Sequence, residues 1–252
     1  MKFGYCTSID ITAIRDLAAA GFDYVELALS ALAEYPDMAG LKKELRDAGI
    51  PCRACNLFFP PSLKLVGQNR DVPGIEAYLA RMLPLAADLG VETVVFGNGG
   101  ARRAQEGDAP DEVYKHLRDL VERMEPHAAR AGLKIAVEPL NAAETNMINN
   151  YAQAVELTEG LTHVATMVDS YHVLMDNQSY EDVLARPDRL FHLHTAYSPE
   201  RLVPALTDDT AAYAPFVAAV RQANYNDKIS IEGKARGSFA EALGALRQIW
   251  KD

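Results

Sequence analysis

The sequence predicts a single (β/α)8 barrel that spans residues 1–252 as one domain. Strand-like and helix-like patterns alternate from one end of the chain to the other, and this alternation indicates a parallel sheet. Eight such units fill a chain of 252 residues without room for a further domain. Most helical stretches end in a glycine just before the next strand. A doubly wound open sheet is the alternative, but it favours a glycine-rich first turn, and "YCTSID" at 5–10 has no glycine.

The individual elements follow from two hydrophobic periodicities. Strand candidates are short runs rich in apolar, β-branched and aromatic residues. In chain order they cover 2–6, 23–29, 52–58, 93–97, 134–140, 164–169, 190–195 and 228–233. Helix candidates repeat apolar residues at a spacing of 3.6. They cover 11–21, 37–50, 74–90, 111–132 and 238–250.

Composition limits the class of protein. The chain carries 25 basic and 35 acidic residues, a net charge of −10, which disfavours a nucleic-acid partner. Neither a signal peptide nor an apolar stretch long enough to cross a membrane is present, so we expect a cytoplasmic protein without a membrane partner. The odd number of cysteines, namely Cys6, Cys52 and Cys55, indicates reduced thiols. The CxxC spacing of the last two is best explained by core packing.

Charged and imidazole side chains lie at one end of the last four predicted strands. Glu138 ends the fifth strand, Asp169 the sixth and Glu232 the eighth, whereas His192 and His194 share one face of the seventh. Each has a simple structural explanation, because carboxylates at strand ends are often solvated or cap helices, and strand histidines often lie satisfied in the core. In a barrel, however, these strand ends meet at one mouth, where active sites form.

Three carboxylates that converge without a cation would repel one another and would be costly to bury. One divalent metal ion removes that cost. A donor set of carboxylates with one imidazole suits Mn²⁺, Mg²⁺ or Co²⁺, and Zn²⁺ is less favoured without thiolates. We therefore expect one divalent metal, with Mn²⁺ as the first choice.

Four segments resemble a known family. "AVEPLNAAETNMINN" (136–150), "VDSYHVLMD" (168–176), "HLHTAY" (192–197) and "SIEGK" (230–234) occur in the order found in the xylose isomerase-like TIM-barrel sugar isomerases and epimerases. Within this family the motifs are most similar to those of the ketose 3-epimerases. The resemblance covers the C-terminal half through motifs and the N-terminal half mainly through the βα rhythm.

The resemblance implies roles for particular residues. The family's metal ligands match Glu138, Asp169, His194 and Glu232, so the second histidine of the HxH pair is the expected ligand. His192 is then expected to orient its neighbours from a deeper position on the same face of the strand.

The family's substrate-binding residues match Glu144, six residues after the first ligand, His172, three residues after Asp169, and Arg201. Two departures bear on substrate identity. Arg201 lies one residue further from the HxH strand than the family spacing, and Ala142 stands where the family often has arginine.

The implied reaction is proton transfer at the carbon next to a sugar carbonyl, through an enediolate. Glu138 and Glu232 would act as the two acid/base groups on opposite faces of a sugar or sugar phosphate. The resemblance also implies a homo-oligomer, a dimer or a tetramer. Alternatives are an aldose–ketose isomerase, a lyase or C-glycoside-cleaving subunit, and a non-catalytic sugar-binding barrel. An endonuclease-IV-like phosphodiesterase fits poorly, because it would need more histidines and a basic face.

Three further features have open interpretations. In "VVFGNGGARR" (94–103), Arg102 or Arg103 could bind a phosphate or a sugar hydroxyl beside glycine N–H groups, or could be solvated in a flexible turn. Phe58 and Phe59, in the 56–65 loop, could cover the barrel mouth, plug a hydrophobic gap or form a subunit contact. Glu26 could face the substrate or have a structural role.

Overall fold

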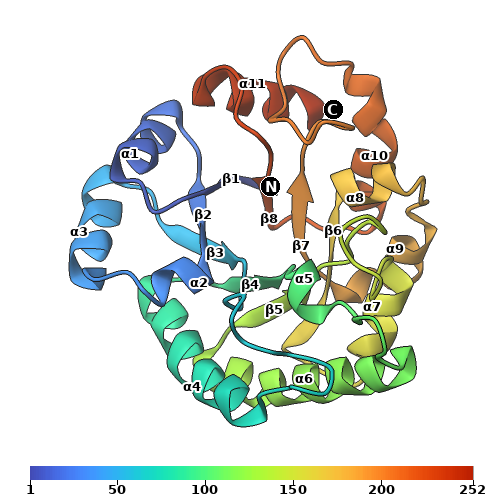
Figure 1. Cartoon of the computed structure of the whole chain (residues 1–252). Coiled ribbons are helices and arrows are strands. Elements are labelled where there is room, and N and C mark those ends of the chain that lie inside the picture. The colour runs from blue at the N-terminus through green and yellow to red at the C-terminus, as the bar shows by residue number, and fades with distance from the viewer. Residues whose placement is uncertain (252) are drawn as a thin grey trace.

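The computed structural model describes residues 1–251. Within these residues, eight parallel strands close into a barrel in sequential order, with β8 pairing back to β1. Figure 1 looks onto the ring of strands, with the helices arranged around it. The predicted (β/α)8 barrel is therefore confirmed, and the open-sheet alternative is wrong.

Each predicted strand has a counterpart in the structure. The strands are β1 (Lys2–Thr7), β2 (Tyr24–Ala28), β3 (Cys52–Asn56), β4 (Thr93–Phe96), β5 (Lys134–Val137), β6 (Val164–Asp169), β7 (Leu190–Thr195) and β8 (Lys228–Ile231). The α-helices are α1 (Ile11–Ala20), α2 (Leu29–Leu32), α3 (Met38–Ala48), α4 (Val72–Leu89), α5 (Gly99–Arg102), α6 (Pro110–Ala131), α7 (Tyr151–Leu157), α8 (Ser170–Met175), α9 (Glu181–Ala185), α10 (Ala214–Gln222) and α11 (Phe239–Ile249). Short 3₁₀ turns cover Pro187–Arg189 and Thr210–Tyr213.

The helix boundaries follow from capping chemistry, as α1 illustrates. The Asp10 side chain accepts hydrogen bonds from the backbone N–H groups of Thr12 and Ala13, which begins the helix. Ile14 and Leu17 point into the core at the helical spacing. Gly21 ends the helix in the left-handed conformation, with φ of 90°, which a residue without a Cβ adopts at little cost.

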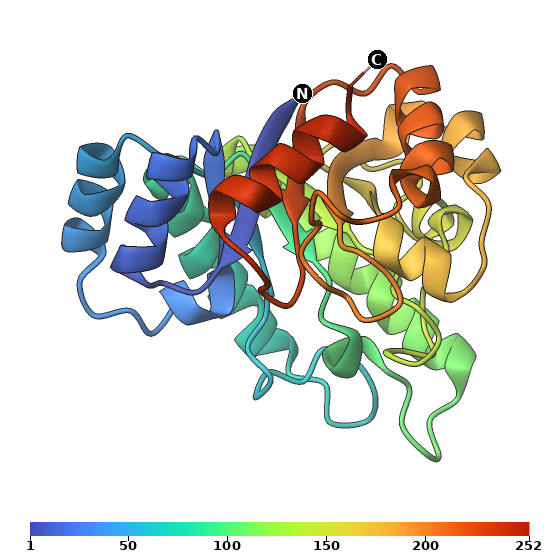
Figure 2. The same ribbon diagram turned by 90° about the horizontal axis from the view of Figure 1, so that it is seen from above.

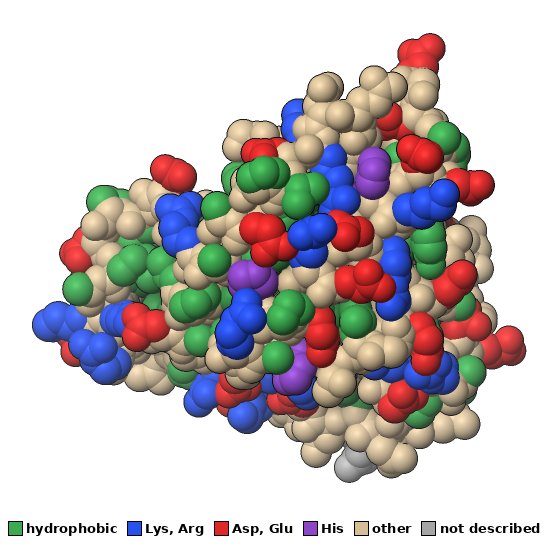
Figure 3. Space-filling model, turned by 90° about the horizontal axis from the view of Figure 1, so that it is seen from below, with side chains coloured by type: hydrophobic (Ala, Val, Ile, Leu, Met, Phe, Trp, Pro, Cys, Tyr) green, Lys and Arg blue, Asp and Glu red, His purple; other side chains and the backbone are tan. Residues whose placement is uncertain are grey.

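The outer surface over α4 and α6 carries both signs of charge. Figure 3 shows acidic and basic side chains interspersed across this face. Arg123 of α6 pairs with Glu76 of α4 at 2.8 Å, and Arg70, just before α4, pairs with Asp119 of α6. This face therefore lacks a continuous basic surface for nucleic acid. Across residues 1–251, no helix combines the length and the apolar character needed to span a membrane.

The long loops gather at one end of the barrel. Figure 2 shows the N-terminus and the end of α11 at one end of the barrel axis and the loops after β3, β4 and β7 at the other. This second end is where the strands finish, so it forms the mouth at which (β/α)8 barrels place their active sites.

Two loop features differ from some of the sequence interpretations. Phe58 and Phe59 are fully buried and stack on each other with their ring centroids 4.3 Å apart, so they plug the core rather than cover the mouth or contact a subunit. Arg102 is also fully buried, and its guanidinium donates to the backbone carbonyls of Phe96, Glu138 and Ile148. It is neither solvated nor free to bind a phosphate.

We expect Arg102→Met to lower the free energy of unfolding by about 3 kcal/mol, because it removes a charged donor from three buried carbonyls. Urea unfolding measures this as a lower midpoint with an unchanged slope. The neighbouring exposed residue supplies the control, since Arg103→Met should shift the midpoint little. Equal midpoints for the two variants would contradict the structural role of Arg102.

Candidate active site

The four predicted metal ligands meet at the mouth of the barrel. Asp169 ends β6 and His194 lies in β7, whereas Glu138 and Glu232 directly follow β5 and β8. Both glutamates keep strand-like pairing, since Glu138 N–H donates to the Phe96 carbonyl and Glu232 N–H to the Thr195 carbonyl. One ligand atom from each of the four residues lies within 4.8 Å of every other.

Several atoms of this cluster have no hydrogen-bond partner among the described residues. Glu138 Oε1, Asp169 Oδ2 and His194 Nδ1 are buried without a hydrogen bond. His194 Nδ1 lies 3.4 Å from Glu138 Oε1 and 3.4 Å from Glu232 Oε2. Buried polar atoms without partners are rare in proteins. Acceptor atoms that face one another in this way fit a divalent cation between them.

The electrostatics of the cluster lead to the same conclusion. Burial raises the pKa of Asp169 to about 6 and also raises the pKa of Glu138. Burial acts on Glu232 as well, but the positive charges of His194 and Arg201 lower its pKa to about 2. Two of the three carboxyl groups therefore resist ionisation in this protein alone, and a central cation would favour their charged forms.

Glu26 determines how His194 presents its ring. Its carboxylate lies in the barrel interior, with Oε1 2.9 Å from His194 Nε2 and Oε2 2.9 Å from His192 Nε2. Burial opposes its charge, but His194 and His192 hold the pKa of Glu26 well below its ordinary value. An ionised carboxylate only accepts hydrogen bonds, so both Nε2 atoms carry hydrogen. Nδ1 is then the nitrogen of His194 that faces the other proposed ligands.

This geometry answers two questions that the sequence left open. Glu26 has a structural role and does not face the substrate, because it is fully buried within β2. His192 stays outside the ligand cluster and shares the Glu26 carboxylate with His194. This contact is what its expected orienting role requires.

A pocket of about 240 Å³ lies beside the ligand cluster, and we call it the catalytic pocket. It is lined by Asn56, Leu57, Gly97, Glu138, Leu140, Glu144, Arg201, Glu232 and Gly233. Glu144 and Arg201, which the family resemblance assigns to substrate binding, are therefore brought together here.

Arg201 reaches the pocket despite its unusual spacing in the sequence. Its guanidinium lies 2.5 Å from Glu232 Oε2 and 3.3 Å from Glu144 Oε1, and it stacks over the Tyr171 ring at 4.8 Å. Its backbone φ is 56°, in the left-handed region, which costs a non-glycine residue about 1–3 kcal/mol. The loop therefore holds this side chain in place at an energetic cost.

His172 is oriented by Asn141. His172 Nδ1 accepts hydrogen bonds from the Asn141 backbone N–H at 3.3 Å and from its side-chain Nδ2 at 2.9 Å. The hydrogen of the neutral ring is therefore on Nε2, which is buried, has no hydrogen-bond partner among the described residues and lies 3.6 Å from Asp169 Oδ2. Asn141 Nδ2 also donates to Glu144 Oε1 at 3.1 Å. One amide thus positions two predicted substrate-binding residues.

Sequence reasoning missed Asn141 and Asn56. Asn56 ends β3, and its Nδ2 donates to Glu232 Oε1 at 2.9 Å. The strand-end rule that selected Glu138 and Asp169 would also have selected Asn56. Asn141 lies in the quoted "PLN", but its sequence neighbours give no sign that it contacts His172.

Gly97 makes room for the Glu138 carboxylate. A Cβ atom at this position would lie 1.9 Å from Glu138 Oε2. Any side chain here would displace Glu138, so the glycine after β4 allows the close approach of this carboxylate to the neighbouring loop.

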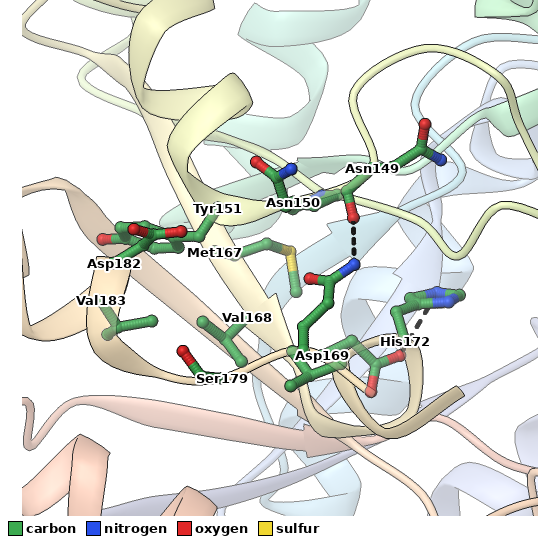
Figure 4. A pocket seen from close by; sticks show the side chains of 13 residues that line it. Asn149, Asn150, Tyr151, Met167, Val168, Asp169, His172, Ser179, Asp182 and Val183 are labelled. Atoms are coloured by element: carbon green, nitrogen blue, oxygen red, sulfur yellow. Dashed lines mark hydrogen bonds and ion pairs between the residues drawn. The ribbon is translucent and has the colours of Figure 1, made fainter. Parts of the chain in front are cut away.

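A separate cavity of about 230 Å³ lies on the far side of Asp169. Figure 4 shows Asp169 and His172 at one end of it and Tyr151, Asp182 and Val183 at the other. We place the chemistry in the catalytic pocket because Glu138 and Glu232 line that pocket and do not line this cavity.

We expect Glu26→Gln to weaken Mn²⁺ binding about 10–100-fold, because an amide cannot accept hydrogen bonds from both imidazoles through its two terminal atoms. Titration calorimetry with Mn²⁺ on metal-stripped protein measures the affinity. Glu34→Gln, at an exposed position shortly after β2, is the matched control and should bind Mn²⁺ as the unaltered protein does. Unchanged affinity in Glu26→Gln would show that this carboxylate does not orient the ligand.

The chain is similar along most of its length to proteins named as sugar epimerases. The D-psicose 3-epimerase of Agrobacterium fabrum is 25% identical over 251 residues, which cover 95% of this chain and 83% of that protein. The L-ribulose 3-epimerase of Methylomonas sp. is 26% identical over 260 residues, with 95% and 85% covered. Among solved structures, a 3-keto-D-glucoside 4-epimerase from E. coli has the same fold, with a TM-score of 0.81, 24% identity and 98% and 99% of the two chains covered.

The family assignment rests on a match along nearly the whole barrel. The model of the xylose isomerase-like TIM barrel matches residues 14–249, from within α1 to the end of α11. The chain therefore belongs to the xylose isomerase-like TIM-barrel family, as its sequence motifs predict.

Proposed function

We propose that this protein is a metal-dependent sugar epimerase that inverts the carbon next to a carbonyl, with a ketose as substrate and C3 as the reacting carbon. The observation that carries the proposal is the pair Glu138 and Glu232, which approach His194 Nδ1 from two different strands beside the catalytic pocket. The 3-epimerase relatives, aligned over 95% of the chain, support the isomerase class.

Glu138, Asp169, His194 and Glu232 would hold one divalent cation, and the carboxylate-rich set favours Mn²⁺ over Zn²⁺. When bound, the metal supplies Lewis acidity that polarises the sugar carbonyl and makes the adjacent C–H more acidic.

Glu138 and Glu232 would carry the proton transfer. Because they follow β5 and β8, their carboxylates can address opposite faces of a sugar that lies between them. One carboxylate takes the proton from one face, and the other donates a proton to the opposite face. Two such groups favour epimerisation over aldose–ketose isomerisation, for which a single base on one face is enough.

The remaining residues would orient the sugar. His172 presents Nε2–H as a donor, whereas Arg201 offers a charged donor and Glu144 an acceptor for hydroxyl groups. Holding the sugar with its C–H near a carboxylate replaces an unfavourable encounter in solution with a fixed geometry.

The loops after β7 and β8 support an unphosphorylated substrate. In many (β/α)8 barrels these loops and a helix N-terminus bind phosphate. Here Glu241 of α11 accepts the Ser238 N–H at 2.8 Å, so the helix caps itself. Arg236 donates to the Val203 carbonyl at 2.6 Å and pairs with Asp208. The Ser238 N–H and the Arg236 guanidinium therefore already have partners within the protein, which leaves them unavailable to a phosphate group. A homo-oligomer without a nucleic-acid partner remains part of the proposal.

Metal removal should abolish catalysis. We expect chelator-stripped protein to exchange no deuterium into a ketose, because the α-proton is then too weakly acidic for a carboxylate to remove at a useful rate. Added Mn²⁺ should restore exchange at C3 and produce the C3 epimer, which NMR in D₂O detects carbon by carbon. Exchange that survives complete metal removal would rule out this mechanism.

Variants that lack one of the two proposed acid/base groups should show the role of each group separately. Glu138→Gln and Glu232→Gln should each slow epimerisation by about 10²–10⁴-fold. Each should still exchange deuterium into the epimer whose proton faces the remaining carboxylate, without inversion. Elemental analysis checks that the variant retains its metal, and the exposed Glu112→Gln is the control. Exchange of both epimers at the unaltered rate would exclude these residues as the acid/base pair.

A further inference from the structure

A further cavity adjoins the catalytic pocket, and we call it the outer cavity. It lies between the loop after β3 and the segment 97–105, and its volume is about 490 Å³, twice that of the catalytic pocket. Leu57 and Gly97 line both spaces. Figures 1 and 2 show the loop after β3 alongside α5 at the barrel mouth.

The boundary that the two spaces share is held by the fold. Gly97 contributes no side chain to the boundary, and the Leu57 side chain is 47% exposed beside it. The Asn98 side chain joins the two loops, because it accepts the Phe59 N–H at 3.1 Å and donates to the Phe59 carbonyl at 2.9 Å. Phe59 is fully buried, so this joint is anchored in the core.

The lining of the outer cavity combines polar donors with apolar walls. Lys64, Arg103 and Gln105 line it from exposed positions, and the partly exposed Leu63 provides apolar surface. Within residues 1–251, Lys64 and Arg103 form no ion pair, so their charged groups are available to a ligand. Donors beside apolar surface suit a molecule that alternates hydroxyl groups with C–H faces, as a sugar does.

We propose that the substrate is a keto sugar joined to a second sugar-sized unit, with the keto sugar in the catalytic pocket and the second unit in the outer cavity. This inference rests on the proposed function. The size difference supports it, since a single ketose in the catalytic pocket would leave the larger of the two adjoining spaces empty. Binding of the second unit can then hold the reacting carbon in place, so that remote contacts contribute to catalysis.

The chemistry restricts how the two units are linked, because the reacting sugar must keep a carbonyl. The link therefore runs either through a hydroxyl of a ketose that is remote from its carbonyl, or through the anomeric carbon of a sugar with an oxidised ring carbon. Both arrangements place a second unit beside the reacting one, and substrate pairs distinguish them.

The first measurement compares matched substrates on the Mn²⁺-loaded protein. One pair is D-fructose and the same ketose carrying a hexose on O-4 or O-6. The other pair is a methyl 3-oxoglucoside and a 3-oxoglucoside whose aglycone is a hexose. We expect the two-unit member of one pair to have a kcat/KM for deuterium exchange at least tenfold above that of its one-unit partner.

A variant that fills part of the outer cavity tests whether the second sugar unit binds there. Gly100 lines the outer cavity and a Cβ atom there would meet no atom within 4 Å, so Gly100→Phe adds a large side chain at this wall. It should lower kcat/KM for the two-unit substrate about tenfold and leave the one-unit substrate unchanged. Ala77→Phe, at an exposed position on α4, is the control. Lys64→Met and Arg103→Met should lower kcat/KM for the two-unit substrate and leave that for the one-unit substrate unchanged.

The outcomes separate the inference from the proposed function. Equal rates for one-unit and two-unit sugars, unaffected by Gly100→Phe, would overturn the outer subsite and leave the epimerase proposal standing. If no sugar exchanges deuterium, the proposed function fails. In that case calorimetry with the two-unit sugars decides the subsite: weaker binding to Gly100→Phe than to the unaltered protein supports it, and equal or absent binding overturns it.

Discussion

Concentrated negative charge at the barrel mouth is the constraint on which the site depends. Glu138, Asp169 and Glu232 converge on His194 Nδ1 in a buried space where carboxylates are poorly solvated. Such a cluster would repel itself in the absence of a cation. The fold maintains it because barrel closure fixes the four strand ends independently of the charge, so packing elsewhere stabilises an arrangement that its own electrostatics would oppose.

Much of the surrounding structure limits the freedom of these ligands. Glu232 is held at one oxygen by Asn56 and at the other by Arg201. The Glu138 backbone carbonyl accepts a hydrogen bond from the buried Arg102. The Glu26 carboxylate fixes the orientation of the His194 ring through its contact with Nε2. Each contact removes an alternative position of a ligand, so binding a metal requires little reorganisation.

The sequence predicted what depends on local pattern and missed what depends on distant contacts. Hydrophobic periodicity located the eight strands, and barrel topology then placed Glu138, Asp169 and Glu232 together. The role of Glu26 could not be read in this way, because its partner His192 lies 166 residues further along the chain. The buried position of Arg102 could not be predicted for the same reason. The carbonyls that accept its hydrogen bonds belong to β4, to the residue after β5 and to a later loop.

The proposed chemistry and the proposed recognition of a second sugar unit occupy different parts of the barrel. Strands β5 to β8 carry all four proposed ligands, and the loops after β7 and β8 use their own donors internally. The loops after β3 and β4 instead enclose a cavity with free donors next to the catalytic pocket. Changes at the exposed positions of those loops that line the cavity, such as Lys64 and Arg103, can alter the substrate without moving a proposed ligand, whereas Gly97 and Arg102 must stay because they position Glu138. Selectivity for one sugar should therefore depend more on residues 57–71 and 97–105 than on the motifs that define the family.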